Sequence, residues 1–409
     1  MINKNSLKIL HTADWHLGKQ LMKVDFGEDM NLFFEWLFNC IIENQINVVL
    51  MSGDLFDQAN PSQLAMKQYY LFLKKLIPLN CKIIITGGNH DSPYVINAPK
   101  ELLDILDIKV VGGSPKTISE LFVEIEINNQ KVVVAAVPFL RDKDIRNALP
   151  GESYNDKIEQ LRVGLADYFN NVNKFYNENY KGLPYIVMAH LFAQGAIVSE
   201  SEREIQIGNQ AGVEAAIFGE EPDYVALGHI HKPQIVGKSH IRYSGSPIQL
   251  SFSEKEDHKE VVILELEGTE FKLTSVKIPQ FRKLISINGS VAEVRALVDN
   301  YTSESVLCDL AELNIIEDHE NIEHIRELEE MLSGEQKNGL QILKGRIDFK
   351  NRIVGSSKIL KAGEDISSFT PTQLFQKRLE QDSSIDNNTE LINAFRDILE
   401  SLDTADEKD

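Results

Sequence analysis

Side chains able to ligate metal ions gather in short clusters along the first 231 residues. Seven of them stand out: Asp14, His16, Asp54, Asn89, His190, His229 and His231. Imidazole, carboxylate and amide groups without thiolate suit divalent ions such as manganese, iron or zinc. Seven ligands are too many for one ion with an open position, and they fit two ions that share one bridging carboxylate. Two ions about 3.5 to 4 Å apart can clamp a phosphoryl group, which predicts phosphate-ester chemistry.

Short apolar runs precede these side chains and predict the strands that position them. The runs cover residues 7–10, 46–51, 82–86, 131–137, 185–189 and 224–227. Helical patterns at 30–45 and from Asn60 to about residue 76 lie between them, which favours right-handed crossovers and a largely parallel sheet. Later strands at 241–243 and 260–266 close the unit. Because the carboxyl ends of parallel strands line one crevice, we expect the scattered ligands to converge there.

Each cluster alone is a weak signal, since a single histidine such as His190 is more often a core residue than a ligand. The combination is far more specific, because five strand ends carry these groups and six of the ten histidines lie there. Five separate strands would otherwise have to end in Asp, Asn or His by accident.

The pattern of expected strands and helices changes near residue 280. Strands at 282–287, 305–310 and 345–349 and helices at 291–300 and 320–332 predict a small mixed α/β domain. Two short amphipathic helices follow, at 371–380 and 389–402. Two interpretations of their apolar faces stay open. They either fold back onto the body or dock on a partner protein, with anchors three and four residues apart.

Composition limits the class of protein. The chain has 409 residues, of which 43% are hydrophobic and 25% charged, so a disordered chain is excluded. Its longest apolar runs are far shorter than the ~20 residues that cross a bilayer, and the start lacks the apolar core of a signal peptide. We therefore expect a cytoplasmic protein without a membrane segment. Three distant cysteines without a Cys-x-x-Cys pair predict reduced packing residues.

The net charge of −20 counts against a polyanionic substrate, because affinity for nucleic acid comes from Lys and Arg that neutralise phosphates. Residues 281–409 hold much of this excess, with 15 Lys and Arg against 26 Asp and Glu. Carboxylates that ligate cations also count as negative in a tally without metal. Net charge therefore does not decide the substrate.

The motifs resemble, in their order, the metallophosphoesterase superfamily of dinuclear phosphate-ester hydrolases. They are Asp-x-His at 14–16, Gly-Asp-x-x-Asp at 53–57, Gly-Asn-His-Asp at 88–91, a histidine after the strand at 185–189, and Gly-His-x-His at 228–231. Longer strings at 11–18, 52–57, 189–192, 199–203, 227–233 and 243–247 resemble the SbcD family of Mre-type nucleases. The resemblance is specific to about residue 255. Beyond 280 it rests on the layout and on the string at 369–375.

The resemblance implies the fold and its domains. It implies an α/β metallophosphoesterase sandwich of two mixed β-sheets flanked by helices, with a small α/β capping domain and a C-terminal helical tail. We expect a nuclease domain at 1–278, a DNA-contacting capping domain at 279–355 and helices for partner binding at 356–409.

The resemblance also implies roles for the ligands. One manganese ion would be held by Asp14, His16 and His231, and the other by Asn89, His190 and His229, with Asp54 bridging the two. His90 is not expected to ligate; it would face the scissile phosphate, stabilise the transition state or protonate the leaving oxygen. The carboxylate of Asp57 would be hydrogen-bonded to His90 and orient its ring, unless Asp57 merely caps a turn.

The implied activity is that of a manganese-dependent DNA phosphodiesterase, a double-strand exonuclease and a single-strand and hairpin endonuclease in DNA repair and recombination. The implied partner is the ATPase subunit SbcC. The resemblance also implies that this chain forms a homodimer within a heterotetramer that contains SbcC. Two alternatives stay open. A small-molecule phosphomonoesterase or cyclic-nucleotide phosphodiesterase would leave the residues after 278 unexplained, and the complete ligand set argues against a non-catalytic DNA-end scaffold.

Overall fold

The computed structural model describes residues 6–146, 153–199, 202, 213–333 and 338–350, with isolated positions between 370 and 395. The chain divides into two compact units. The first comprises Met1–Ile287, Val298–Leu313 and Gly334–Lys344, and the second comprises Asn288–Leu297, Asn314–Ser333 and Gly345–Asp409. All the predicted site residues belong to the first unit.

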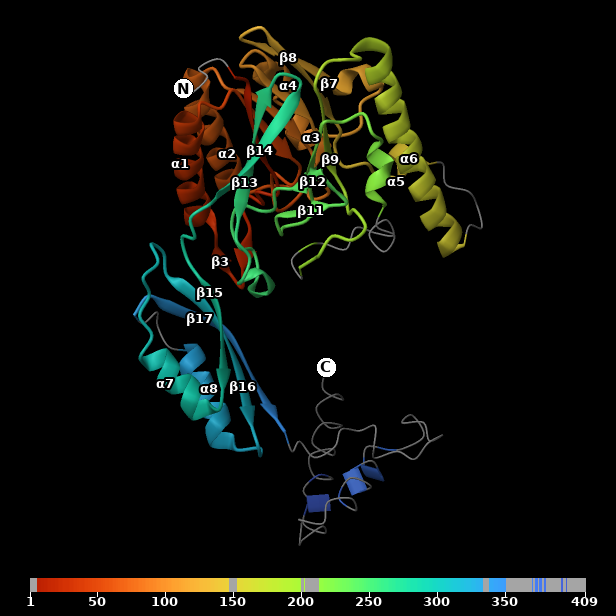
Figure 1. Cartoon of the computed structure of the whole chain (residues 1–409). Coiled ribbons are helices and arrows are strands. Elements are labelled where there is room, and N and C mark those ends of the chain that lie inside the picture. Colours follow the sequence, from red (N-terminus) through yellow and green to blue (C-terminus); the bar gives the residue numbers. More distant parts are fainter. Residues whose placement is uncertain are drawn as a thin grey trace. The chain divides into compact units, whose positions relative to one another are not determined.

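Two six-stranded sheets form the body of the first unit (Figure 1). The first sheet has the order β14 (Glu270–Lys277), β13 (Glu260–Glu267), β1 (Lys8–Thr12), β4 (Val48–Ser52), β5 (Lys82–Thr86) and β6 (Ile108–Val111). The second has the order β11 (Gln234–Val236), β12 (Lys238–Tyr243), β10 (Tyr224–Gly228), β9 (Tyr185–His190), β8 (Gln130–Ala136) and β7 (Phe122–Ile127).

Both sheets are mixed, and each contains four parallel strands that are neighbours in the sheet. In the first sheet β1, β4, β5 and β6 are parallel, while β13 pairs antiparallel with β1. In the second, β8, β9, β10 and β12 are parallel, and β7 and β11 are antiparallel edge strands. The parallel strands of each sheet therefore end at a common edge, where their carboxyl ends can present side chains together.

Alternation along the strands explains why the sheets stack. Ile9 and Leu50 belong to the core that also contains Ile186 and Val225 of the second sheet. The neighbouring Leu10 belongs to a separate core with residues of the helices. Because successive side chains of a strand point to opposite faces, β1 and β4 contribute to both cores, and each of them is covered on both faces of the sheet.

Helices flank the sheets (Figure 1). Their bounds are α1 (Gly27–Asn44), α2 (Gln63–Leu76), α3 (Pro93–Asn97), α4 (Lys100–Asp104), α5 (Asp142–Ile145) and α6 (Tyr154–Asn179). The helix α2 begins after Ser62, whose Oγ accepts a hydrogen bond from the backbone N–H of Ala65 at 3.1 Å, and not at Asn60. The long α6 has a similar cap at Ser153, where the Oγ accepts from the backbone N–H of Asp156.

A three-stranded sheet and two helices follow residue 280. The sheet has the order β15 (Leu284–Gly289), β16 (Asp309–Glu317) and β17 (Leu340–Phe349), and the helices are α7 (Val291–Asp299) and α8 (Ile322–Ser333). The strand expected at 305–310 is wrong for most of its length, since Val306 is 74% exposed and the strand begins at Asp309. Acidic residues break the apolar run of β16 and obscure its pattern. The capping-domain bounds remain a prediction.

Two further expectations concern the C-terminal helices and the membrane. The helices predicted at 371–380 and 389–402 lie largely outside the described residues, although the rings of Phe375 and Phe395 stack with centroids 4.1 Å apart. Within the described part of the chain, no helix is both long and apolar enough to cross a membrane.

Candidate dinuclear metal centre

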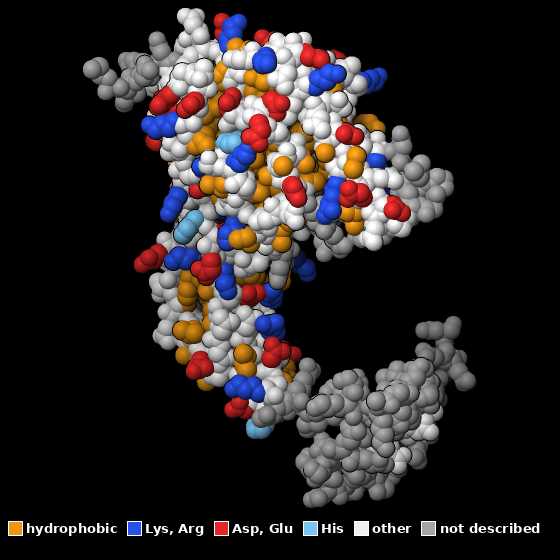
Figure 2. Space-filling view, turned by 45° about the vertical axis from the view of Figure 1, so that its right-hand side comes forward, with side chains coloured by type: hydrophobic (Ala, Val, Ile, Leu, Met, Phe, Trp, Pro, Cys, Tyr) orange, Lys and Arg blue, Asp and Glu red, His pale blue; other side chains and the backbone are white. Residues whose placement is uncertain are grey.

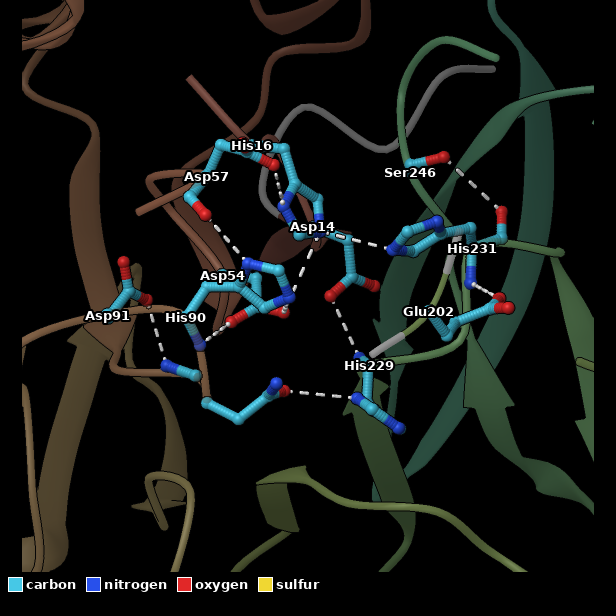
Figure 3. Close-up of polar contacts among 12 residues, drawn as sticks. Asp14, His16, Asp54, Asp57, His90, Asp91, Glu202, His229, His231 and Ser246 are labelled. Atoms are coloured by element: carbon cyan, nitrogen blue, oxygen red, sulfur yellow. Dashed lines mark hydrogen bonds and ion pairs between the residues drawn. The ribbon is translucent and has the colours of Figure 1, made fainter. Parts of the chain in front are cut away.

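The carboxyl ends of five parallel strands carry the seven predicted ligands. Loops after β1, β4 and β5 of the first sheet supply four of them: Asp14, His16, Asp54 and Asn89. The second sheet supplies the other three, from the end of β9 and the loop after β10: His190, His229 and His231. The two sheets thus bring residues more than 200 positions apart in the sequence to one place (Figure 3).

Asp54 stands at the centre of this group. Its Oδ2 lies 3.3 Å from Nε2 of His190 and 3.6 Å from Nε2 of His16. Its Oδ1 accepts the backbone N–H of His90 at 2.8 Å. Sets of donor atoms within 4.8 Å of one another form two groups that share Asp54: one also holds His190 and His229, and the other Asp14 and His16. A carboxylate shared by two donor sets is the arrangement that a bridging ligand requires.

His16 and His231 point their ring nitrogens at each other. The two Nε2 atoms lie 3.1 Å apart, and both rings are buried (Figure 3). Two ring nitrogens can face each other at this distance only across a proton or a metal ion. The carboxylate Oδ2 of Asp14 is also buried and lacks a hydrogen-bond partner among the described residues. This corner of the site therefore suits a cation.

His190, Asn89 and His229 form the other corner. The Asn89 Oδ1 lies 2.9 Å from Nε2 of His190 and 3.1 Å from Nδ1 of His229. The other ring nitrogen of His190 donates to the carbonyl of Ser52 at 3.0 Å, which leaves Nε2 as the atom that faces the site. One amide oxygen and two imidazole nitrogens are ligands that manganese, iron and zinc accept.

The backbone is strained at four of the seven predicted ligands. Asp14, His16, Asp54 and His229 have φ values of 53°, 47°, 50° and 100°. Such left-handed conformations are uncommon in residues other than glycine and cluster at functional sites. Close packing adds a second constraint, because a Cβ on Gly53 would lie 2.1 Å from Nδ1 of His190. The strained backbone at these four residues directs their side chains toward the site.

Electrostatics also favour a cation. Burial raises the pKa of Asp14 to about 7, since a charged carboxylate is poorly solvated there. Burial would lower the pKa of His190, but the Asp54 and Asp14 carboxylates beside it raise that pKa to about 9. The protein therefore holds buried negative charge that a proton compensates in part, and divalent ions would compensate it better.

His90 lies beside the predicted ligands, and one of its ring nitrogens lies within 4.8 Å of donor atoms of His16 and Asp57. Its ring packs edge-on against His16, with centroids 4.7 Å apart, and its Nε2 lies 4.0 Å from Oδ2 of Asp54. The Nδ1 donates to the main-chain carbonyl of Asp57 at 2.7 Å (Figure 3). The expectation that the Asp57 carboxylate accepts this hydrogen bond is thus corrected. That carboxylate instead lies 3.4 Å from Nδ1 of His16 and 3.2 Å from Nζ of Lys19.

The correction has a geometric reason. The turn after β4 brings the Asp57 carboxylate to the loop after β1, while the Asp57 carbonyl accepts the hydrogen bond from His90. Although burial would raise the pKa of Asp57, the contacts with His16 and Lys19 lower that pKa to about 2. Asp57 therefore contacts two histidines: its carbonyl accepts a hydrogen bond from His90, and its carboxylate lies close to Nδ1 of His16.

Several supporting residues were not predicted from the sequence. Asp91 accepts backbone N–H groups of Leu55, Phe56 and Gly88, at 2.9 to 3.0 Å, and so ties two ligand loops together. Its place in the Gly-Asn-His-Asp motif was a usable signal. Glu254 lies 3.2 Å from Nδ1 of His231. It follows none of the five strands that carry the ligands, and its neighbours in the sequence do not indicate this role.

The basic and aromatic neighbours have mostly structural contacts. Lys232 pairs with Asp257 at 2.9 Å, and Arg242 donates to the carbonyl of Ser239. Trp15 is buried against aromatic rings of α1 and α2, so its contacts are those of a packing residue.

Comparison with known proteins agrees with this geometry. Residues 7–233 match the family model of calcineurin-like phosphoesterases. Three curated relatives are each named as the SbcD subunit of the nuclease SbcCD. The protein of Escherichia coli (strain K12) is 29% identical over 309 residues, which cover 73% of this chain and 75% of the relative. The one of Bacillus subtilis (strain 168) is 29% identical, with 74% and 78% covered, and that of Rhodobacter capsulatus is 32% identical, with 64% and 67% covered.

The chain belongs to the calcineurin-like phosphoesterases and, within them, to the SbcD family. Members of the phosphoesterase family hydrolyse phosphate esters with divalent metal ions, and the clustered donors of this SbcD-family chain fit such ions. The predicted fold class, the family and the enzyme class are confirmed. The assignment of individual residues to individual ions stays a prediction.

Proposed function

We propose that this SbcD-family chain is a DNA nuclease that works with two manganese ions. One ion would be held by Asp14, His16 and His231, the other by Asn89, His190 and His229, and both by Asp54. The observation that carries the proposal is the position of Asp54, whose Oδ2 lies 3.3 and 3.6 Å from imidazole nitrogens of the two sets. The buried carboxylates of Asp14 and Asp54 would supply the negative charge that two cations neutralise.

The bound ions would polarise a phosphodiester and stabilise the charge that develops on its oxygens. The protein's own residues fix the rest of the geometry. The Nδ1–H of His90 donates a hydrogen bond to the Asp57 carbonyl, so Nε2 is the ring atom that faces the predicted ligands. In its charged form, the proton on Nε2 would stabilise the phosphorane-like transition state or pass to the leaving oxygen.

We propose DNA as the substrate and an SbcC-type ATPase as the partner, because the curated relatives are subunits of a nuclease named SbcCD. Acidic and basic side chains are interspersed over the face of the molecule in Figure 2. Given the net charge of −20, we expect tight DNA binding only together with the partner. A homodimer within a heterotetramer, a cytoplasmic location and the capping and tail domains at 279–355 and 356–409 are parts of the same proposal.

The experiment is the manganese-dependent digestion of a labelled DNA hairpin and of a linear duplex by the full chain, with the partner and ATP. We expect cleavage with the native protein, and a loss of about 10² to 10⁴-fold with His90→Ala at unchanged metal content. Chelation of the metal should abolish both activities.

Hydrolysis of a chromogenic phosphodiester separates this proposal from a small-molecule phosphoesterase. Activity on that compound without cleavage of DNA, in the presence of partner, ATP and manganese, would favour the small-molecule enzyme. DNA binding that needs no metal, with no hydrolysis when metal is added, would favour a scaffold.

A further inference from the structure

A hydrogen-bond network holds His231 at three points. Its backbone N–H donates to Oε1 of Glu202 at 2.9 Å, and its carbonyl accepts from Nζ of Lys259 at 2.9 Å. Its ring Nδ1 lies 3.2 Å from Oε1 of Glu254. Figure 3 shows Glu202 and Ser246 beside His231. Three charged side chains thus surround a single predicted ligand.

Lys259 and Glu254 form a charge pair inside the protein. Lys259 is 6% exposed and Glu254 is fully buried. The three donors of the Lys259 ammonium are all used: on Oε2 of Glu254 at 2.5 Å, on Oγ of Ser246 at 2.8 Å and on the His231 carbonyl. Because an ammonium has three N–H donors, this set is complete. Oε2 of Glu254 accepts in addition the backbone N–H of Leu250 at 3.2 Å.

The pair leaves one carboxylate oxygen for the histidine. Lys259 and the Leu250 N–H occupy Oε2 of Glu254, so Oε1 is the atom that accepts the hydrogen bond from His231 Nδ1. The Oγ of Ser199 donates to the same oxygen at the longer distance of 3.4 Å. This contact fixes the tautomer in which Nε2 carries a lone pair, and it makes the ring a better ligand. That lone pair then faces Nε2 of His16 at 3.1 Å.

We infer that Glu254 is a positioning residue for the metal ligand His231 and that Lys259 fixes the carboxylate of Glu254 for this task. The inference rests on the two-ion assignment proposed above. Its effect should fall on one ion, because the hydrogen bonds of Glu254 and Lys259 reach His231, whereas Nδ1 of His190 in the other set donates to the carbonyl of Ser52. Glu254 and Lys259 thus tune the ion of Asp14, His16 and His231.

The test is calorimetric titration of the metal-free full chain with manganese alone, which reads binding without activity. The native chain should bind two ions. Glu254→Gln keeps the shape of the side chain but removes its charge, and should weaken one of the two sites about 10 to 100-fold while the other keeps its affinity.

Asp309→Asn is the matched control. Asp309 in β16 is likewise fully buried, and it accepts hydrogen bonds from the backbone of Lys283 and the hydroxyl groups of Tyr301 and Ser303. It touches no predicted ligand through these bonds. The control should therefore lose stability without changing either manganese affinity.

A second variant covers the case in which Glu254→Gln does not fold. Glu254→Asp keeps the charge beside Lys259 and withdraws the oxygen from His231, so it should show the same selective loss. Unchanged affinity at both sites in either folded variant would overturn the inference, as would an equal loss at both sites. A native chain that binds fewer than two ions would instead overturn the metal assignment proposed above.

Discussion

The main-chain carbonyl of Asp57 accepts a hydrogen bond from Nδ1 of His90 at 2.7 Å. This contact does not depend on the identity of the side chain at position 57. The carboxylate of the same residue lies 3.4 Å from Nδ1 of His16 and pairs with Lys19. Mutation at this position therefore separates the support of a metal ligand from the orientation of His90.

Asp57→Asn should weaken manganese binding about tenfold, because a carboxylate that supports a ligating histidine contributes to its affinity. Turnover at saturating manganese should stay near the native value, since the carbonyl still holds His90. Calorimetry and steady-state rates at several manganese concentrations measure the two effects. His90→Gln is the complementary control, with lower turnover and native affinity. A loss of turnover in Asp57→Asn that excess manganese does not restore would contradict this division of roles.

Asp54 and Asn89 should differ in the number of ions that their loss releases. Asp54 lies within 3.6 Å of nitrogens from both ligand sets, whereas Asn89 contacts only His190 and His229 among the predicted ligands. Asp54→Ala should release both ions and lower the rate by about 10³-fold or more, as expected when several kcal/mol of metal stabilisation is lost. Asn89→Ala should release one. Elemental analysis of manganese per chain after dialysis distinguishes the outcomes, and equal stoichiometry in the two variants would argue against a bridging Asp54.

The clustering of the candidate ligands could be predicted because strand ends are local features. Apolar runs followed by Asp, Asn or His locate β1, β4, β5, β9 and β10 to within a few residues. The strand at 82–86 has the predicted bounds. What a local pattern could not show is which atom of Asp57 faces His90, because this depends on the direction of one turn.

Residues that support a predicted ligand from a distant part of the sequence could not be predicted either. Glu254 and Lys259 reach His231 across more than 20 residues of sequence, and their motif resembles any charged surface loop. The strand β16 was misplaced because acidic residues interrupt its apolar positions. Residues that act through others carry little signal in sequence, whereas residues that touch a metal are limited to a few chemical types.

The buried thiols should resist alkylation in the native state. Burial raises the pKa of the Cys40 thiol to about 11 and that of Cys81 to about 12. At pH 8 the reactive thiolate would then be about 10⁻³ or less of either residue. Native protein treated with iodoacetamide should therefore be modified first at Cys308, which is partly exposed.

Peptide mass spectrometry over time measures these rates. Raising the pH from 8 to 9 should speed the reaction of Cys40 and Cys81 about tenfold, because both pKa values lie above this range. Urea should make all three cysteines react at similar rates. Reaction of Cys81 as fast as Cys308 in the folded chain would contradict its burial.

Gly53 offers the sharpest test of how the backbone aims the ligands. Its φ is +83°, and an added Cβ would lie 2.1 Å from Nδ1 of His190. Gly53→Ala should therefore push the His190 ring out of place and lower manganese affinity, in addition to a strain of about 1 to 2 kcal/mol for the left-handed backbone. Thermal unfolding and manganese titration measure the two parts separately.

Gly268→Ala is the control, since Gly268 has a similar φ of +70° and a Cβ added there would meet nothing within 4 Å among the described residues. It should show the same strain with native manganese affinity. The difference between the two variants then isolates the contact with His190. If Gly53→Ala binds manganese as tightly as Gly268→Ala does, the close packing of the turn after β4 on His190 is not needed to hold the ion.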